Sequence, residues 1–398
     1  MAGNLSGDAS RMTLPESTID LFSDETLANT AAAYQALRDT GPIVFLPAND
    51  LFAVTQYQSV KQALRADLVL VNSKGVAANP IINDTTAEAT LTSDGETHLR
   101  RRAILMRPLT PRALEDVKQR IDETADRLVQ DLMARDEFCG VADFASHLPV
   151  SIVADLVGLE ESGRENMLEW AAATFNALGP LNGRTQAALH TAADLIQYVH
   201  QLGPDRVRDG GWAARILAEA QSGVLTPGEG AMMVVDYVAP SLDTTILASA
   251  QMLWRLASTD GAFDTLRSNP DLVPSVVNES VRLASPIREF TRYAASDYEA
   301  DGLTIPAGGR AAMLYASANW DERHYADADQ FQVDRNPRDH LGWGHGAHTC
   351  AGMHLARLEM EALARALIRH VKKIEADEPV PLVNNVLQGF AAIPARLH

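Results

Sequence analysis

Cysteine is nearly absent from this chain, which has only Cys139 and Cys350 among its 398 residues. The two lie far apart in the sequence, so a disulfide framework is excluded and a reducing compartment, the cytoplasm, is the expected location. Basic residues are in the minority, because 34 lysines and arginines face 52 acidic residues and give a net charge of −18. Such a charge argues against a nucleic-acid partner.

The sequence also shows no targeting or membrane-spanning pattern. Residues 1–13 hold a single arginine and no apolar segment, and we expect no later run to reach the ~18 to 20 apolar residues that a membrane span requires. Hydrophobic residues make up 46% of the chain, enough for a large core. We therefore expect no membrane association, a single domain over residues 1–398 and a monomer.

Helical periodicity dominates what is present. Helices are predicted over residues 24–39, 57–66, 97–106, 111–134, 148–157, 185–202, 227–257, 272–283 and 353–374. Two apolar runs around a turn predict a β-hairpin within residues 43–57, and a second β region is predicted within residues 293–316. The fold class is thus mainly α with small β-sheets, a β-rich lobe at these two segments and an α-rich lobe elsewhere. Residues 71–93, rich in Asn, Thr, Ala and Gly, predict a long mobile loop.

The most informative segment, residues 343–352, places Cys350 between a glycine-rich loop and a predicted helix. Unpaired N–H groups and the helix dipole favour a thiolate there, so we expect a lowered pKa for the cysteine and a role as metal ligand. Gly344 and Gly346 permit a tight backbone, and Gly352 leaves room for a flat ligand. The competing interpretation is zinc held by nearby histidines and this cysteine: His345, His348, Cys350 and His354. A structural zinc site usually has a second ligand cluster, which this sequence lacks.

Two further pairs stand at helical spacing. Glu279 and Arg282 are three residues apart and share a helix face, which is also the pattern of a surface salt bridge. His98 and Arg102 are four residues apart in the His98-Leu99-Arg100-Arg101-Arg102 segment, which is equally typical of a solvated basic face. Either pair alone is weak support for a functional site.

A third feature interrupts the apolar helix predicted over residues 227–257. Pro240 lacks an N–H group, so the helix is expected to kink or open there. Ser241 and Thr244 can bond to the freed backbone, which would give a kinked core helix and nothing more. The functional interpretation is a groove for a diatomic ligand, in which Asp243 and Thr244 relay protons.

Taken together, these motifs resemble bacterial cytochromes P450, and the resemblance covers nearly the whole chain. It implies that Cys350 is the proximal ligand of a haem b iron, with His348 as a partner of a haem propionate. In the family's cysteine loop, Gly344 follows a position that is usually phenylalanine, and Trp343 stands there in this chain. An indole still shields the thiolate, but its N–H adds a donor that can alter the iron potential.

The same resemblance assigns roles to the other motifs. Glu279 and Arg282 correspond to a structural Glu-x-x-Arg pair that locks to a later arginine, here Arg335. Further haem-propionate ligands correspond to His98, Arg102 and Arg292. Catalytic roles fall to Asp243 and Thr244, the acid and alcohol of the oxygen-binding groove. The family usually has Gly at Ser241 and often a small residue at Pro240, so this chain departs from the pattern in the groove.

The implied function is a monooxygenase that inserts one oxygen atom of O2 into a small hydrophobic substrate. The C-terminal segment 384–390 resembles that of members acting on small aromatics, including aryl methyl ethers, and a terpenoid is the next expectation. The expected pocket comprises residues 71–93 and 174–181 with Asp236, Ala239, Pro240, Ser241, Ile287, Phe290 and Phe390. The alternative function is a haem protein that binds ligands without oxygenating them, as a sensor or carrier.

Electrons must then come from a separate protein, since two cysteines cannot hold a four-cysteine iron–sulfur cluster. We expect a ferredoxin or a ferredoxin/flavin reductase to dock on a proximal basic face. The residues predicted to form that face are Arg100, Arg101, Arg107, Arg112, His354 and Arg357.

Overall fold

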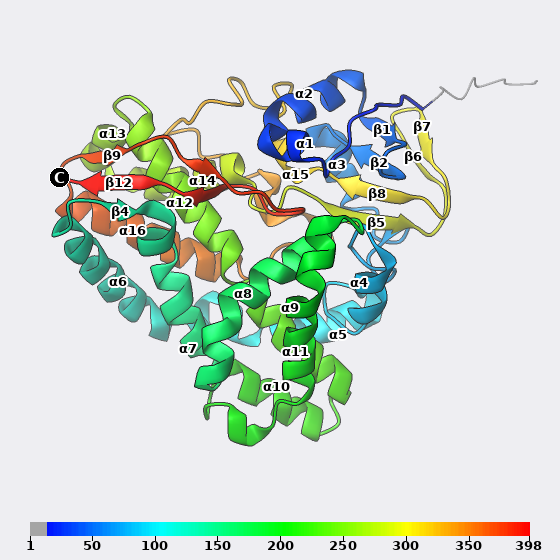
Figure 1. Ribbon diagram of the computed structural model, residues 1–398, viewed down its shortest axis with the longest axis horizontal. Helices are drawn as coiled ribbons and strands as arrows, with labels where there is room; N and C mark the ends of the chain where they lie inside the picture. Colours follow the sequence, from blue (N-terminus) through cyan, green and yellow to red (C-terminus); the bar gives the residue numbers. More distant parts are fainter. Residues whose placement is uncertain (1–13) are drawn as a thin grey trace, which may run out of the picture.

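The computed structural model describes residues 14–398, and these form a mainly helical molecule with small sheets (Figure 1). The α-helices are α1 (Asp24–Ala28), α2 (Thr30–Thr40), α3 (Tyr57–Ala63), α4 (Pro80–Thr85), α5 (Gly95–Leu105), α6 (Pro111–Met133), α7 (Ala154–Val157), α8 (Glu161–Ala177), α9 (Gly183–His200), α10 (Trp212–Gln221), α11 (Pro227–Val238), α12 (Asp243–Ser258), α13 (Ala262–Ser268), α14 (Val273–Ala284), α15 (Tyr315–Asn319) and α16 (Met353–His370). Two π-helical turns, Gly140–Ala145 and Pro149–Val153, precede α7. The predicted fold class is confirmed.

The largest sheet joins segments that are far apart in the sequence. Its strand order is β1-β2-β8-β5-β3, with β1 (Ile43–Leu46), β2 (Leu51–Val54), β3 (Leu70–Val71), β5 (Phe290–Ala294) and β8 (Arg310–Met313). The hairpin pairs Ile43 with Val54, and β2 runs parallel to β8. The expected strand through residue 316 is too long, because β8 ends at Met313 and α15 begins at Tyr315.

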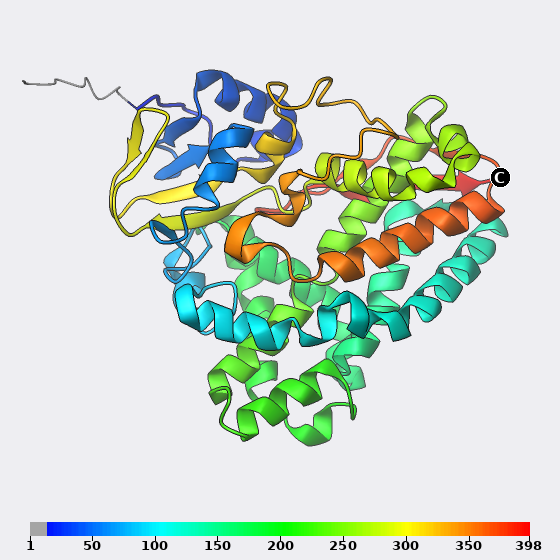
Figure 2. The same cartoon turned by 180° about the vertical axis from the view of Figure 1, so that it is seen from behind.

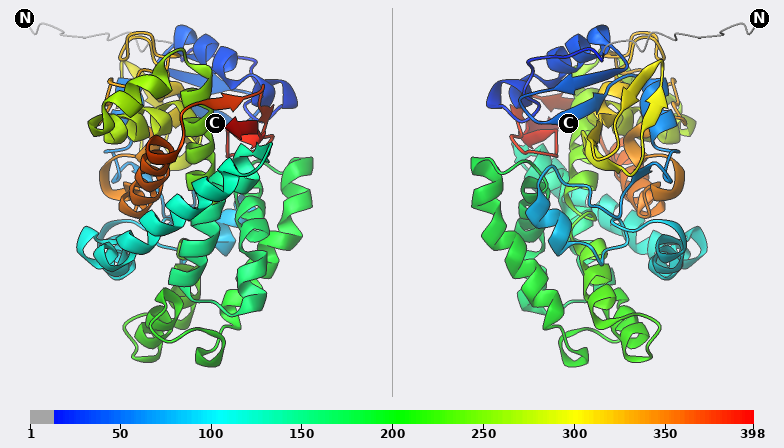
Figure 3. Two further views of the ribbon diagram at one scale, coloured as in Figure 1. Left: turned by 90° about the vertical axis from the view of Figure 1, so that its left-hand side faces the viewer. Right: turned by 90° about the vertical axis from the view of Figure 1, so that its right-hand side faces the viewer.

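Short strands complete the molecule. β6 (Tyr298–Ala300) pairs with β7 (Leu303–Ile305), and β10 (Val380–Pro381) pairs with β11 (Phe390–Ala392). A three-stranded sheet has the order β4 (Phe138–Cys139), β12 (Pro394–Leu397), β9 (Ile374–Ala376). The largest sheet lies at one end of the molecule, and the helices α8 to α11 extend toward the other (Figure 3). Helix α16 ends at His370, before its predicted boundary at residue 374, because β9 begins at Ile374.

The core helices enclose the region that carries the motifs. Helix α12 packs against α14, and α16 packs against both α14 and α6. Figure 2 shows α16 in orange and α5 in cyan on the same face of the molecule, with the cysteine loop leading into α16. Residues 343–352 thus lie between the sheet end and the helical core.

Two stretches are long and apolar enough to cross a membrane, contrary to the expectation that none would be. They span Gly140–Val157 and Pro227–Ser258, and 50% and 72% of their apolar windows are buried inside the protein. The second is divided into α11 and α12 by four non-helical residues. Packing within the molecule occupies their apolar surface, as in the core helices of a globular fold.

The predicted break in the long helix is present, whereas the predicted mobile loop has a different character. Helix α11 ends at Val238 and α12 begins at Asp243, so Pro240 lies in the interruption. Residues 71–93 contain the short helix α4 and are tied by internal hydrogen bonds, among them Asn72 Nδ2 donating to Leu91 O at 2.8 Å. The polar side chains of this segment form hydrogen bonds to its own backbone.

Candidate active site

The cysteine loop is held by its glycines and by one backbone bond. The N–H of Cys350 donates to the carbonyl of Trp343 at 2.8 Å. Gly344 and Gly346 have positive φ angles of 69° and 76°. A Cβ atom on Gly346 would stand 2.6 Å from the carbonyl oxygen of Leu64 in the turn after α3. Any other residue there would force the loop away from that turn.

The thiol of Cys350 does not show the lowered pKa that we expect from the helix dipole. Cys350 is exposed as a residue, yet enough protein surrounds its thiol for burial to raise the pKa. The backbone N–H groups of Gly352 and Met353 and the charge of Arg102 act in the opposite direction and do not prevail. A cation bound at the sulfur would itself deprotonate the thiol, so ligation does not depend on the helix.

Four nitrogen-bearing side chains converge beside this loop. The rings of His98 on α5 and His348 lie 4.1 Å apart between centroids, and Arg102 donates to the Thr349 carbonyl at 2.5 Å. Arg292 on β5 is 4% exposed, and its charge acts on His348. Three segments that are far apart in the sequence therefore supply one cluster of hydrogen-bond donors.

The charge states of this cluster follow from burial and from one carboxylate. Burial lowers the pKa of His98 to about 4, with the charges of His348 and Arg102 adding to the effect. Burial also lowers the pKa of His348. For Asp94, burial acts to raise the pKa, but bonds from His348 and Ser73 outweigh it and lower the pKa. Asp94 Oδ1 lies 3.8 Å from His348 Nε2, a contact that the sequence interpretation missed.

These residues fit a haem, on two observations. His98 Nε2 is buried without a hydrogen-bond partner among the described residues, so the cluster has unused capacity for an acceptor. The donor set, two arginines and two histidines beside a soft sulfur ligand, matches a dianionic ring edge and an iron centre. A Cβ atom on Gly352 would stand 4.0 Å from Cys350 Sγ, an ordinary van der Waals distance, so this contact does not by itself require glycine.

Trp343 is partly buried and packs against the large hydrophobic core. The guanidinium of Arg357 on α16 lies 5.8 Å from its ring centroid, and the ring of His340 lies at 6.0 Å. The indole Nε1 is buried and finds no acceptor within residues 14–398. It also lies beyond hydrogen-bond reach of Cys350 Sγ, so the additional donor does not act on the sulfur directly in this geometry.

Glu279 and Arg282 form a buried ion pair on α14. Arg282 donates to both carboxylate oxygens of Glu279 at 2.8 Å, and both side chains are 0% exposed. Arg282 also donates to the carbonyls of Asn319 and Ala328, each at 2.7 Å. Arg335 Nε lies 3.1 Å from Glu279 Oε1, as the resemblance implies. The surface salt bridge is therefore the wrong alternative.

The helix interruption between α11 and α12 carries several polar groups. Ser241 donates to the carbonyl of Tyr237, and Thr244 Oγ1 donates to the carbonyl of Pro240 at 2.9 Å. Pro240 itself is exposed. Asp243 Oδ2 is buried without a hydrogen-bond partner in the described part of the chain, and burial raises the pKa of this carboxyl to about 7. A carboxyl with that pKa can accept and release protons near neutral pH.

The structure brings together part of the expected pocket. Ile287 and Phe290 pack against one apolar cluster, whose buried members are Val76, Ala77, Ile82, Ala173, Phe175, Ala177, Leu178, Ala188, Ala192, Leu247, Val386 and Leu387. Residues 71–93, the end of α8 and the C-terminal segment thus meet.

Three expected pocket residues lie differently. Phe390 on β11 packs against Trp254 with ring centroids 5.2 Å apart, and the preceding Gly389 leaves no room for a Cβ atom beside Leu247. Ala239 is 6% exposed and belongs to the large core. Asp236 Oδ2 accepts the N–H of Thr90 at 2.9 Å, and burial raises the pKa of this carboxyl.

Three arginines of the predicted basic face pair with carboxylates in the structure. Arg100 and Arg101 pair with Glu229, and Arg101 is 7% exposed. Arg107 pairs with Glu219. These carboxylates belong to α10 and α11, which the sequence does not show to lie near α5. Because these ion pairs neutralise the arginines, this surface has little electrostatic potential with which to steer a redox partner.

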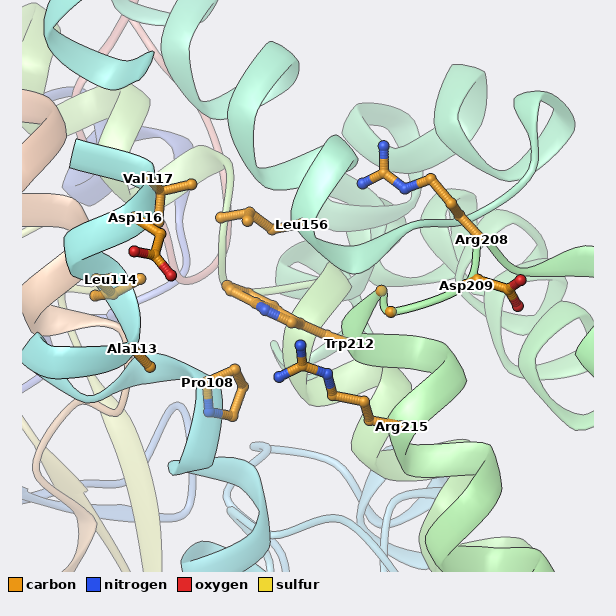
Figure 4. A pocket seen from close by; sticks show the side chains of 12 residues that line it. Pro108, Ala113, Leu114, Asp116, Val117, Leu156, Arg208, Asp209, Trp212 and Arg215 are labelled. Atoms are coloured by element: carbon orange, nitrogen blue, oxygen red, sulfur yellow. The ribbon is translucent and has the colours of Figure 1, made fainter. Parts of the chain in front are cut away.

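A surface cleft lies apart from all these residues. Figure 4 shows its lining side chains, among them Trp212, Arg215, Pro108, Val117 and Leu156, and its accessible volume is about 340 Å³. It contains none of the predicted site residues. We assign it no part in the chemistry.

The protein described so far is a haem-thiolate protein, on the evidence of its cysteine loop, buried donor cluster and interrupted helix. Comparison with known proteins leads to the same class. A family model described as Cytochrome P450 matches residues 215–395. The chain is 33% identical over 390 residues to cytochrome p450 CYP199A2 of Rhodopseudomonas palustris, with 96% of this chain and 95% of the relative covered. It is 26% identical over 408 residues to beta-dihydromenaquinone-9 omega-hydroxylase of Mycobacterium tuberculosis, covering 98% of this chain and 80% of that protein.

Among solved structures, Mycobacterium marinum cytochrome P450 CYP268A2 in complex with pseudoionone matches with a TM-score of 0.86 and 28% identity, over 97% of this chain and 100% of that one. The chain therefore belongs to the cytochrome P450 family. It is a P450 monooxygenase whose cofactor is haem b and which requires a substrate and a redox partner.

Proposed function

We propose that this enzyme inserts one oxygen atom of O2 into a small hydrophobic substrate, by hydroxylation or oxidative O-demethylation. Small aromatics and aryl methyl ethers are the first class to test, and terpenoids the second. The observation that carries the proposal is the apolar cluster around Ile287 and Phe290, which adjoins the interrupted helix through Leu247. An apolar lining selects an apolar substrate and excludes water from the reaction.

Cys350 would hold the iron, and His98, Arg102, Arg292 and His348 would hold the propionates. When bound, haem supplies the activation of dioxygen, and a thiolate ligand increases the electron density that favours O–O cleavage. The balanced outcome of a turnover is one oxygenated substrate and one water, with two electrons and two protons consumed.

Proton delivery is the task of the interrupted helix. Asp243, with its pKa raised by burial to about 7, can pass protons inward, and Thr244 can orient a water through its hydroxyl. At the interruption the hydroxyls of Ser241 and Thr244 donate to the carbonyls of Tyr237 and Pro240, so the groove is stable without closing into a regular helix.

Electrons would come from an acidic ferredoxin or ferredoxin/flavin reductase, in a cytoplasmic setting. Among the exposed arginines, Arg65 donates to His345 Nε2 of the cysteine loop at 2.8 Å, and Arg338 precedes Trp343 by five residues in the sequence. Neither pairs with a carboxylate among residues 14–398. They would replace the neutralised arginines of α5 as the docking charges.

The test begins with the haem-loaded protein. Small aromatic, aryl methyl ether, terpenoid and fatty-acid ligands are screened for a spin-state change in the absorption spectrum. Binding ligands are then incubated with NADH, redox partners and isotopically labelled dioxygen. One labelled atom in the product supports the proposal, whereas a spin-state change with no oxygenated product would identify a ligand-binding or sensor protein instead.

A further inference from the structure

The surface cleft of Figure 4 has no part in the proposed function. It lies where the start of α6, the end of α7 and the start of α10 meet. Its volume of about 340 Å³ lies within the range of roughly 300 to 1,000 Å³ that small-molecule sites occupy. None of the residues assigned to the haem, the oxygen groove or the substrate pocket lines it, so a ligand here would bind independently of that function.

Trp212, the first residue of α10, forms one wall of the cleft. The side chain is 5% exposed, and its ring packs against Tyr237 on α11 with centroids 5.0 Å apart. Tyr237 is held in turn, since its hydroxyl donates to the carbonyl of Leu105 at 2.8 Å. The indole Nε1 donates no hydrogen bond to residues 14–398 and is not enclosed by them, so its N–H is open to the cleft. A fixed, buried side chain whose donor lacks an acceptor indicates a ligand that accepts hydrogen bonds.

Arg215 adds a positive charge at the same wall. It lies three residues after Trp212 on α10, and Figure 4 shows its guanidinium beside the indole. Burial raises the pKa of Tyr237, and the charge of Arg215 acts against this rise, so the guanidinium lies near that ring as well. Arg215 forms no ion pair with residues 14–398, whereas Arg208, which also lines the cleft, pairs with Asp155. The donors of Arg215 are therefore available to an anion.

The start of α10 favours a negative charge at this point as well. Its N-cap, Gly211, offers no side-chain bond to the N–H groups of the first turn. A Cβ atom on Gly211 would stand 3.0 Å from the carbonyl oxygens of Val157 and Arg208, so a residue with a capping side chain fits only if the backbone shifts. The first N–H groups of the helix then depend on water or a ligand, and the helix dipole attracts an anion.

The opposite wall combines apolar side chains with one carboxylate. Val117 on α6 and Leu156 on α7 lie across the cleft from the indole in Figure 4. Asp116 lies beside Val117, whereas Asp209 points away from Trp212. The donors therefore stand at one side of the cleft and a carboxylate at the other. An apolar ligand with one negative charge fits this arrangement, and a second negative charge would meet Asp116.

We propose that this cleft is a binding site for an apolar monocarboxylate, separate from the haem site. The carboxylate accepts hydrogen bonds from Arg215 and from Trp212 Nε1, and its hydrocarbon body packs against Val117 and Leu156. Charge-assisted bonds from a guanidinium are among the stronger ones in proteins, and an apolar wall selects such a ligand over an inorganic anion. No local sequence pattern predicts the site, because only the fold brings its three segments together.

The experiment uses the haem-loaded protein saturated with 4-phenylimidazole, whose nitrogen ligates haem iron, so that the haem pocket is occupied. Isothermal titration calorimetry then measures binding of 3-phenylpropanoate, of its neutral analogue 3-phenylpropanamide and of inorganic phosphate, while the absorption spectrum verifies that the imidazole stays bound. We expect the carboxylate to bind about tenfold more tightly than the amide, the factor for a charge-assisted hydrogen bond, and more tightly than phosphate. Arg215→Gln should remove this preference by raising the Kd of the carboxylate about tenfold with little effect on the amide. Trp212→Phe keeps a ring but loses the N–H, and should weaken both ligands several-fold.

The control is Arg127→Gln, because Arg127 is an exposed arginine of α6 outside the cleft that donates to Thr124 Oγ1 at 3.2 Å and forms no ion pair with residues 14–398. Its affinity for 3-phenylpropanoate should match the wild type. The proposal is wrong if the saturated protein binds no 3-phenylpropanoate, if the amide binds as tightly as the carboxylate, or if both arginine variants weaken binding equally. Arg215 is exposed, so its variant decides the matter if Trp212→Phe is unstable. No turnover is needed, so the site and the proposed oxygenase function can each fail while the other stands.

Discussion

Single side chains on the two sides of the site contribute by different means. On the proximal side the requirement is shape, because Gly346 faces the Leu64 carbonyl and cannot carry a Cβ atom. On the distal side it is hydrogen bonding, because Thr244 Oγ1 is held by the Pro240 carbonyl. A hydroxyl that donates to a carbonyl still has lone pairs with which to accept from a water.

That geometry predicts a specific defect in Thr244→Ala. Haem and substrate binding should persist, while proton delivery fails and hydrogen peroxide release rises several-fold per NADH consumed. The measurement is the ratio of product to NADH oxidised, with peroxide assayed in parallel. Thr244→Ser keeps the hydroxyl and should retain the wild-type ratio. Unchanged coupling in the alanine variant would remove Thr244 from the proton path.

Helix α14 shows how a buried pair differs from a surface pair at the same spacing. Glu279 and Arg282 are fully buried, and Arg282 also donates to three backbone carbonyls while Arg335 pairs with Glu279. Asp264 and Arg267 on α13 lie 3.5 Å apart, with side chains 78% and 36% exposed. Removing one partner of a buried pair leaves an uncompensated charge, and removing one of an exposed pair does not.

We therefore expect Glu279→Gln to destabilise the protein by about 3 to 5 kcal/mol and to reduce haem retention. Asp264→Asn, the matched pair at the same spacing, should cost about 1 kcal/mol or less. Urea unfolding of both variants gives the comparison. Equal effects would mean that the α14 pair stabilises no more than a surface ion pair.

Elements with strong local signals could be predicted from the sequence. The 43–55 hairpin follows from two apolar runs around a turn, and the helix interruption follows from the missing N–H of Pro240. The sequence does not predict helices α8 and α10. In α8, Gly163 and a polar run obscure the apolar periodicity, and α10 is short. The pairing of Arg100 and Arg101 with Glu229 depends on tertiary packing, which no local pattern encodes.

The molecule as a whole buries several carboxyl groups without an ion-pair partner. Burial raises the pKa of Asp243 and of Glu289 to about 7, and that of Glu359 on α16 to about 8. Between an unfolded carboxyl pKa of about 4.3 and these values the folded state binds more protons than the unfolded state. The contribution of these three carboxyls to the free energy of unfolding must then decrease as pH rises through this window, whereas the buried histidines with lowered pKa values, His98 and His348, contribute with the opposite sign below about pH 6.5.

Glu359→Gln tests this sign. Glu359 is 1% exposed and its Oε1 has no partner within the described chain. Between about pH 5 and about pH 8 the stability of the variant should increase relative to that of the wild type, because the variant lacks the proton that Glu359 binds in the folded state. Urea unfolding at both pH values measures the difference, with Glu361→Gln on the same helix as control. A variant whose stability changes with pH as much as that of the wild type would show that Glu359 does not carry this proton.

Because the protein has a net charge of −18, a local basic face is the part of its surface that would attract an acidic partner. Arg65→Glu should slow reduction by an acidic ferredoxin several-fold and weaken its dependence on ionic strength. Stopped-flow reduction at low and high salt is the measurement. A rate that is unchanged and equally salt-dependent would place the partner elsewhere.

The central claim is that Cys350 ligates a haem iron through its thiolate. The absorption spectrum of the reduced carbon monoxide complex tests it most directly, in the wild type and in Cys350→His. The wild type should give the long-wavelength Soret band of thiolate ligation, and the histidine variant should bind haem but give the shorter-wavelength band of nitrogen ligation. A wild-type spectrum without the thiolate band, or a long-wavelength band that survives in Cys350→His, would contradict the account.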